Sequence, residues 1–119
     1  MGIRRERSSP TYDLDEVKRI AAEGRISIAT RPRQFITNRV GRFDVVAFMQ
    51  ELFEAMEPEG FYKTEELEVM PAVWGDVYRP IPFIEPESGE SNDWYVKFFV
   101  DGERIRARVM SANYDGYIH

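Results

Sequence analysis

The sequence predicts an α+β domain in which a small antiparallel sheet of about four to five strands packs on two to three helices. Three observations support this fold class. The first half has two stretches of apolar residues at helical spacing, each preceded by an aspartate suited to N-capping. The second half has four segments rich in aromatic and β-branched residues, separated by turn-forming residues. A chain of 119 residues is also short enough to share one hydrophobic core.

The N-terminus differs in composition from the rest of the chain. Residues 1–10 are rich in Arg and Ser and show no apolar periodicity, so they predict a disordered basic leader. The remaining residues show no Gly- or Ser-rich linker and no internal repeat. We therefore place a single folded domain over residues 11–119.

The first half of the domain predicts a helix, a short strand, a loop and a second helix. The first helix follows Asp13, which forms a capping box with Glu16. Residues 26–30 alternate and are rich in Ile, which indicates a short strand. Residues 31–42 contain a proline, a glycine and four arginines, and they predict a loop. Asp44 is then the expected N-cap of the second helix, whose apolar stripe we assign to the core.

The second half predicts a run of strands. We place them at about residues 61–67, 72–79, 93–100 and 104–110. The intervening segment 80–92 holds several prolines and glutamates and predicts an exposed acidic loop. Asp101-Gly102 predicts a two-residue hairpin between the last two strands.

Composition excludes several kinds of chemistry. The chain has no cysteine, and its single histidine is the last residue, His119. Disulfides, thiolate metal sites and Ser-His triads are therefore excluded, and catalysis would have to use Lys, Arg, Tyr, Asp or Glu. The net charge of −5 is uneven, because residues 1–44 hold ten Lys/Arg and six Asp/Glu, whereas residues 45–119 hold six and fifteen. The arginines of 31–42 indicate either a solvated loop or a surface for RNA or a partner.

Strand alternation predicts one polar face of the sheet. The side chains placed on this open face are Lys63, Glu65, Arg79, Tyr95, Lys97, Arg106 and Arg108. Such a row is either a solvated sheet face or a functional site. The same alternation directs the aromatic side chains Tyr62, Trp74, Tyr78 and Trp94 toward the core. Asp76 lies on the core-facing row, where we expect a structural hydrogen-bond acceptor.

The order of these segments resembles one known protein family. Phe61-Tyr62-Lys63, the run from Trp74 to Pro80 that reads WGDVYRP, and the strand containing Tyr95-x-Lys97 are similar to the central strands of the MqsR family of bacterial toxins. The likeness covers roughly residues 11–110. It implies a fold similar to the RelE-like mRNA interferases, and a type II toxin that is a metal-independent endoribonuclease acting by 2′-OH attack. It also implies single-stranded mRNA as substrate, a cognate antitoxin as protein partner, no cofactor and a cytoplasmic location.

The resemblance also implies site residues. Lys63 and Tyr95 match two proposed catalytic positions of the family, whereas the position of its glutamine is occupied here by Gly75. We add Arg79, for the scissile phosphate, and Glu65, as an alternative base to Lys63, because both lie on the same predicted face.

Four further residues complete the predicted site. We expect RNA contacts from Lys97, Arg106, Arg108 and Tyr62, and no metal ligands. Another polar side chain, such as Gln34, Asn38 or Glu65, could replace the missing glutamine. The glycine and the acidic balance also favour an alternative, a weakened or inactive family member that acts as a protein- or RNA-binding module.

Overall fold

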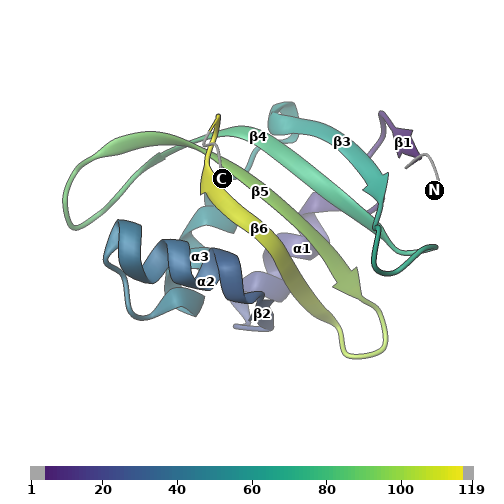
Figure 1. The fold of residues 1–119 in the computed structure, drawn as a ribbon, viewed down its shortest axis with the longest axis horizontal. Coiled ribbons are helices and arrows are strands. Elements are labelled where there is room, and N and C mark those ends of the chain that lie inside the picture. Colours follow the sequence, from purple (N-terminus) through teal and green to yellow (C-terminus); the bar gives the residue numbers. More distant parts are fainter. Residues whose placement is uncertain (1–4, 117–119) are drawn as a thin grey trace.

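The computed structural model describes residues 5–116 and shows a six-stranded sheet with helices against one face (Figure 1). The strands are β1 (Glu6–Arg7), β2 (Ile26–Ile28), β3 (Phe61–Glu66), β4 (Trp74–Ile84), β5 (Ser91–Asp101) and β6 (Arg106–Tyr114). The helices are α1 (Leu14–Ala22), α2 (Thr30–Phe35) and α3 (Val45–Ala55), with a π-helical turn η1 (Ile36–Val40) and a 3₁₀ turn η2 (Pro58–Gly60).

The α+β class is confirmed, and the sheet is larger than expected. Its strand order is β1-β3-β4-β5-β6-β2. Every neighbouring pair is antiparallel except β2 and β6, which are parallel. The sheet is therefore mixed, because the short strand after α1 joins its far edge instead of standing alone.

The two capped helices form where the sequence predicts them. The side chain of Asp13 accepts a hydrogen bond from the N–H of Asp15, and that of Asp44 accepts one from the N–H of Ala47. Their apolar stripes pack against one face of the sheet. Fully buried members of this core include Val17, Ile20, Phe48, Leu52, Phe53, Tyr78, Trp94, Val96 and Phe98. The other face, called the open face below, is not covered by a helix of the described residues (Figure 1).

The predicted loop over residues 31–42 is wrong, because α2 and η1 occupy most of it. Pro32 lies in the first turn of α2, where its missing N–H would have no partner inside the helix in any case. Pro32 and Ile36 are buried, and the ring of Phe35 lies 5.6 Å from that of Trp94. The apolar residues of this segment therefore anchor a helix to the core.

The exposed loop expected over residues 80–92 is also wrong for most of its length. β4 continues to Ile84 and pairs with β5, and the alternate residues Ile81 and Phe83 are buried in the core. Pairing between β3 and β4 ends at Phe61 and Tyr78, so the later part of β4 is an edge strand on that side. Prolines are tolerated there because no ladder bond toward β3 is lost.

A smaller difference occurs at the turn between β5 and β6. A hairpin joins β5 and β6 as predicted, but its turn runs through residues 102–105. The carboxylate of Asp101 accepts the N–H of Glu103, and Ile105 has a φ of 49°. Asp101-Gly102 therefore begins a longer turn than the two-residue one expected.

The N-terminal segment is more ordered than the predicted leader. Residues 1–4 lie outside the described residues, but Glu6–Arg7 pair with β3 as β1. The guanidinium of Arg7 lies 4.1 Å from the centre of the Trp74 ring. Trp74 is half-buried against this segment, outside the main core in which it was expected.

Asp76 fastens the segment that follows β1 to the sheet. This residue is fully buried, and its carboxylate accepts the N–H groups of Thr11 and Tyr12, each at 3.0 Å. Burial raises the pKa of Asp76, and hydrogen bonds from Thr64, Thr11 and Tyr12 oppose part of that shift. Asp76 is thus the structural acceptor that the sequence predicts.

We predict that Asp76→Ala lowers the free energy of unfolding by about 2 kcal/mol, because two backbone N–H groups lose their acceptor. Urea unfolding at neutral pH measures this change. Asp93→Ala is the matched control, because Asp93 is exposed on β5 and should change the value by less than about 0.5 kcal/mol. Equal unfolding midpoints for Asp76→Ala and the parent would contradict this role.

Candidate functional site

A β-bulge in β3 brings two neighbouring side chains to the open face. Phe61 pairs with Tyr78, but Lys63 already pairs with Val77, so Tyr62 is the extra residue. The ring of Phe61 packs 5.6 Å from that of Tyr78, whereas Tyr62 is 54% exposed. The prediction that Tyr62 points to the core is therefore wrong, because strict alternation does not hold across a bulge.

Glu65 links two lysines on the open face. Its side chain is only 6% exposed, and its two oxygens lie 2.6 Å from the Nζ of Lys97 and 3.1 Å from the Nζ of Lys63. The Nζ of Lys63 also lies 2.6 Å from a carboxylate oxygen of Glu6 in β1. Side chains from three strands thus form one ionic network.

The network sets the protonation of its members. Burial opposes ionisation of Glu65, but hydrogen bonds from Lys97 and Lys63 outweigh it and lower the pKa of Glu65 to about 2. The hydrogen bond from Lys63 to Glu6 raises the pKa of Lys63, and burial only partly opposes it. Lys63 is therefore a stable cation, which argues against its expected alternative role as a base.

Gly75 lies next to this network. It pairs in register with Glu65, and a Cβ atom on residue 75 would lie 3.0 Å from Cδ2 of Leu67 and 3.2 Å from Cε of Lys97. The side chains of neighbouring residues thus already fill the space above the glycine. Of the three side chains considered as replacements for a glutamine here, Glu65 lies opposite Gly75. The other two, Gln34 and Asn38, line a separate cleft beside α2.

Arg79 lies between two tyrosines. Its guanidinium carbon is 5.2 Å from the ring centre of Tyr62 and 5.8 Å from that of Tyr95. Its Nε lies 2.7 Å from a carboxylate oxygen of Asp115, just after β6. Tyr62 in turn lies 5.7 Å from the Nζ of Lys63, so these groups continue the ionic network across the sheet.

Six of the eight predicted site residues therefore form one continuous patch, which we call the sheet site. Its members are Tyr62, Lys63, Glu65, Arg79, Tyr95 and Lys97. Sequence reasoning missed Glu6 and Asp115, the carboxylates that complete the pairs. Both lie near chain ends, and nothing in their local pattern indicates contact with the sheet.

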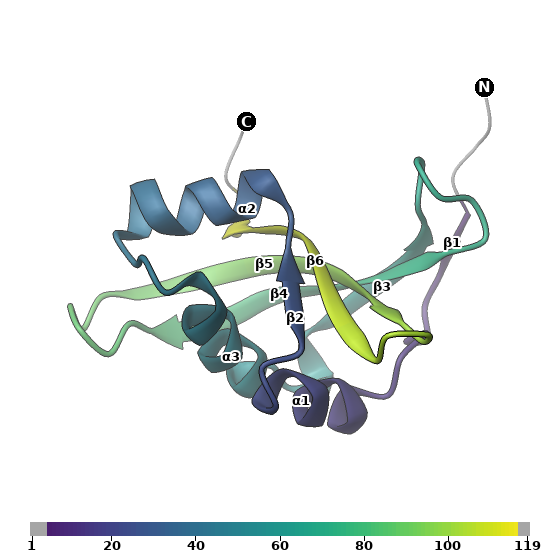
Figure 2. The same cartoon turned by 90° about the horizontal axis from the view of Figure 1, so that it is seen from below.

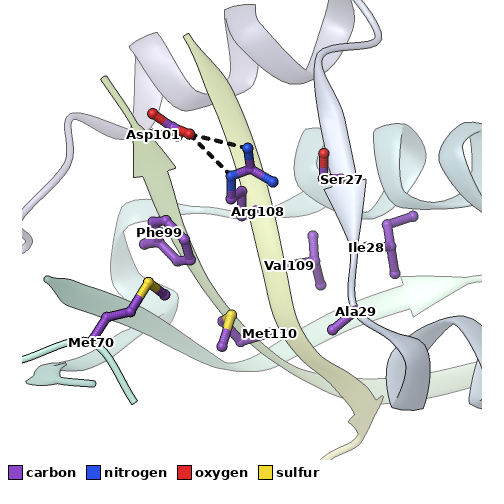
Figure 3. A pocket seen from close by; sticks show the side chains of 9 residues that line it. All are labelled: Ser27, Ile28, Ala29, Met70, Phe99, Asp101, Arg108, Val109 and Met110. Carbon is purple, nitrogen blue, oxygen red and sulfur yellow. Dashed lines mark hydrogen bonds and ion pairs between the residues drawn. The ribbon is translucent and has the colours of Figure 1, made fainter. Parts of the chain in front are cut away.

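Arg106 and Arg108 are not part of the sheet site. Arg106 donates a hydrogen bond to the carbonyl of Ile26 in β2. Arg108 pairs with Asp101 at 3.1 Å, at the wall of a mostly apolar pocket of ≈ 420 Å³ that Phe99 and Met110 also line (Figure 3). Their expected contacts with RNA phosphates would have to compete with these partners.

Comparison with known families supports the resemblance. A family model described as "Motility quorum-sensing regulator, toxin of MqsA" matches residues 9–112, and the chain belongs to this family. It is therefore a toxin of a toxin–antitoxin system, and the family implies an antitoxin as its partner. A search of curated proteins found no match. No helix of residues 5–116 is long and apolar enough to cross a membrane.

We predict that the Glu65 network makes folding sensitive to acid. The pKa of this carboxyl is about 2 in the folded protein against an ordinary 4.5, so its stabilisation is complete above about pH 5 and is lost as the pH falls toward 2. The loss should reach about 3 kcal/mol. Urea unfolding of the parent and of Glu65→Gln across this pH range measures it.

The Glu65→Gln variant should be less stable at pH 7 and should show a flatter pH dependence. Glu59→Gln serves as the control, since Glu59 is exposed in η2. Parallel curves for the parent and Glu65→Gln would show that the network does not control acid stability.

Proposed function

We propose that this member of the MqsR toxin family is a metal-independent endoribonuclease that cleaves single-stranded mRNA. The observation that carries the proposal is the sheet site, which gathers two lysines, an arginine and two tyrosines on the open face. Cleavage of RNA without a metal requires cations to stabilise charge on the phosphate and a group to protonate the leaving oxygen. The sheet site contains side chains for both tasks.

The proposed reaction is an internal transfer at phosphorus. The 2′-oxygen loses its proton and bonds to the adjacent phosphorus, and the bond from phosphorus to the 5′-oxygen breaks. The products are a 2′,3′-cyclic phosphate and a 5′-hydroxyl. Lys63 and Arg79 stabilise the negative charge that develops on the phosphate, and Tyr95 donates the proton that the leaving 5′-oxygen needs.

Proton removal from the 2′-OH is the most demanding step. The raised pKa of Lys63 favours a purely electrostatic role for it, so we assign the base to Glu65, which is ionised. A carboxylate with a pKa of about 2 is a weak base. Because a phosphate that attracts Lys63 also weakens the Lys63–Glu65 bond, substrate binding raises the proton affinity of Glu65.

The exposed ring of Tyr62 has a role in substrate binding. It lies beside Arg79, and more than half of its surface is free to contact a ligand. Single-stranded RNA presents unstacked bases that pack on such aromatic rings. We therefore assign to Tyr62 the stacking of a base next to the scissile phosphate. Lys97 adds further positive charge near Lys63, because both lysines pair with Glu65.

A second candidate function is a binding module with little or no catalysis. It is favoured by the charge balance, because Lys63, Lys97 and Arg79 are matched by the carboxylates of Glu6, Glu65 and Asp115. Gly75 also supplies no polar side chain. In this alternative the same face binds RNA or protein, and the toxin acts without cutting its substrate.

We predict that the purified protein cleaves a single-stranded mRNA in the presence of EDTA and leaves cyclic-phosphate ends. Lys63→Ala and Tyr95→Phe should each slow cleavage about 100-fold or more, because each removes a group used in the transition state. The measurement is the single-turnover cleavage rate of labelled RNA, with product ends identified by mass spectrometry.

Lys18→Ala is the matched control, because Lys18 lies on α1 and bonds to the carbonyl of Glu54, away from the sheet site. It should cleave as fast as the parent. Absence of cleavage by folded protein at high concentration would reject the ribonuclease and leave the binding module.

A further inference from the structure

The α2–η1 segment carries several arginines that have no carboxylate partner among the described residues. Between Glu23 and Asp44 the sequence has five arginines and no acidic residue. Two of these arginines pair with glutamates, Arg25 with Glu23 and Arg42 with Glu51. The other three, Arg31, Arg33 and Arg39, form no ion pair within residues 5–116. In a chain of net charge −5, this helical segment therefore offers uncompensated positive charge.

Two of the three arginines line a cleft. The cleft has a volume of ≈ 490 Å³ and lies between the α2–η1 segment and β6. Its polar lining residues are Arg31, Gln34, Asn38, Arg39, Ser111 and Asn113. Arg33 is exposed on the same helix but does not line it. We call this hollow the α2 cleft.

The α2 cleft adjoins the sheet site. Asn113 and Ser111 of β6 are the register partners of Tyr95 and Lys97 in β5, and neighbouring strands lie about 4.8 Å apart. The pairing of β2 with β6 ends at Val109, and the chain then turns into α2, which runs beside the last part of β6 (Figure 2). The helix therefore forms a wall at the edge of the open face, one strand away from Tyr95.

We propose that the α2 cleft binds a nucleotide of single-stranded RNA next to the nucleotide held at the sheet site. Gln34 and Asn38 each carry an amide with donors and an acceptor, which suits the hydrogen-bonding edge of an unstacked base. Arg31 and Arg39 bring guanidinium groups to the adjoining phosphates. The proposal rests on the proposed function in one respect, that the sheet site holds the scissile phosphate.

The geometry of the strands suits a substrate longer than one nucleotide. From β3 to β6 the open face spans three interstrand spacings, about 14 Å. An RNA strand that crosses Lys63, Arg79 and Tyr95 in turn reaches β6 and then the cleft. The paired cations of the sheet site contribute little net attraction, whereas the unpaired arginines attract the phosphates. An acidic protein surface would also match the positive charge of the α2 cleft. It would not use the concave shape of the cleft or the hydrogen-bonding groups of its amides.

The test measures binding separately from cleavage. A fluorescent 2′-O-methyl oligoribonucleotide cannot undergo 2′-OH attack, and its affinity for the parent protein is measured by anisotropy over a range of salt concentrations. Arg31→Gln/Arg39→Gln should weaken binding about 10-fold and reduce the slope of log affinity against log salt by about 1.4, which corresponds to two phosphate contacts. Arg33→Gln is the matched control, and it should weaken binding by less than about twofold.

The contribution of the Gln34 and Asn38 amides to RNA binding is tested with a separate variant. Gln34→Ala/Asn38→Ala should reduce the difference in affinity between oligonucleotides of different base composition and leave the salt slope unchanged, because the amides contact a base and not a phosphate. All four side chains are exposed, so the variants should melt at the temperature of the parent.

Three results would overturn the proposal. They are unchanged RNA affinity in Arg31→Gln/Arg39→Gln, no RNA binding by the folded parent, and loss of antitoxin binding with unchanged RNA binding, which would make the cleft a protein-docking surface. Arginine-dependent RNA binding without cleavage would support the α2 cleft and reject the ribonuclease. If the parent cleaves RNA and Arg31→Gln/Arg39→Gln binds RNA as tightly as the parent, the ribonuclease would be supported and the α2 cleft rejected.

Discussion

The open face is organised around one buried carboxylate. Glu65 is almost fully covered, and its bonds to Lys63 and Lys97 stabilise its ionised form there. Glu65 also holds the long, flexible side chains of Lys63 and Lys97, which come from different strands, at defined positions. Gly75 takes part in this arrangement, because any side chain on residue 75 would require Leu67 and Lys97 to move. The packing around Glu65 and its partner Lys97 therefore depends on the absence of a side chain at residue 75.

In the proposed function, charge pairing separates two properties of the surface: rigid placement of the reacting groups and long-range attraction of RNA. Each cation of the sheet site has a carboxylate partner, so the site holds its groups rigidly but attracts a polyanion weakly at a distance. The arginines of α2 and η1 differ, since Arg31 and Arg39 line a cleft and form no ion pair with any residue of 5–116. The proposed binding of RNA by a chain of net charge −5 therefore requires that attraction and chemistry occur on neighbouring elements.

The sequence predicted the elements that depend on local patterns and missed those that depend on distant partners. α1 and α3 were predictable because a capping aspartate and an apolar stripe lie within one segment. The strand through Pro80 and Pro82 was not, because those prolines are tolerated only where β3 no longer pairs with β4. Five residues of the sheet site were placed on the correct side of the sheet. Tyr62 was placed on the wrong side, because its bulge could be recognised only from the β3–β4 register.

The distinction between local patterns and distant partners also applies to the protonation of the site residues. The family resemblance implied catalytic roles for Lys63 and Tyr95, but the protonation of Lys63 depends on a neighbour that lies far away in the sequence. Glu6 is 57 residues from Lys63 and raises its pKa, which makes that lysine an electrostatic group. In the proposed mechanism the role of base therefore falls to Glu65, whose proton affinity is lowest while both lysines are bound to it. A phosphate that drew Lys63 away would weaken this hold, so the proposed base would become stronger only when a substrate is present.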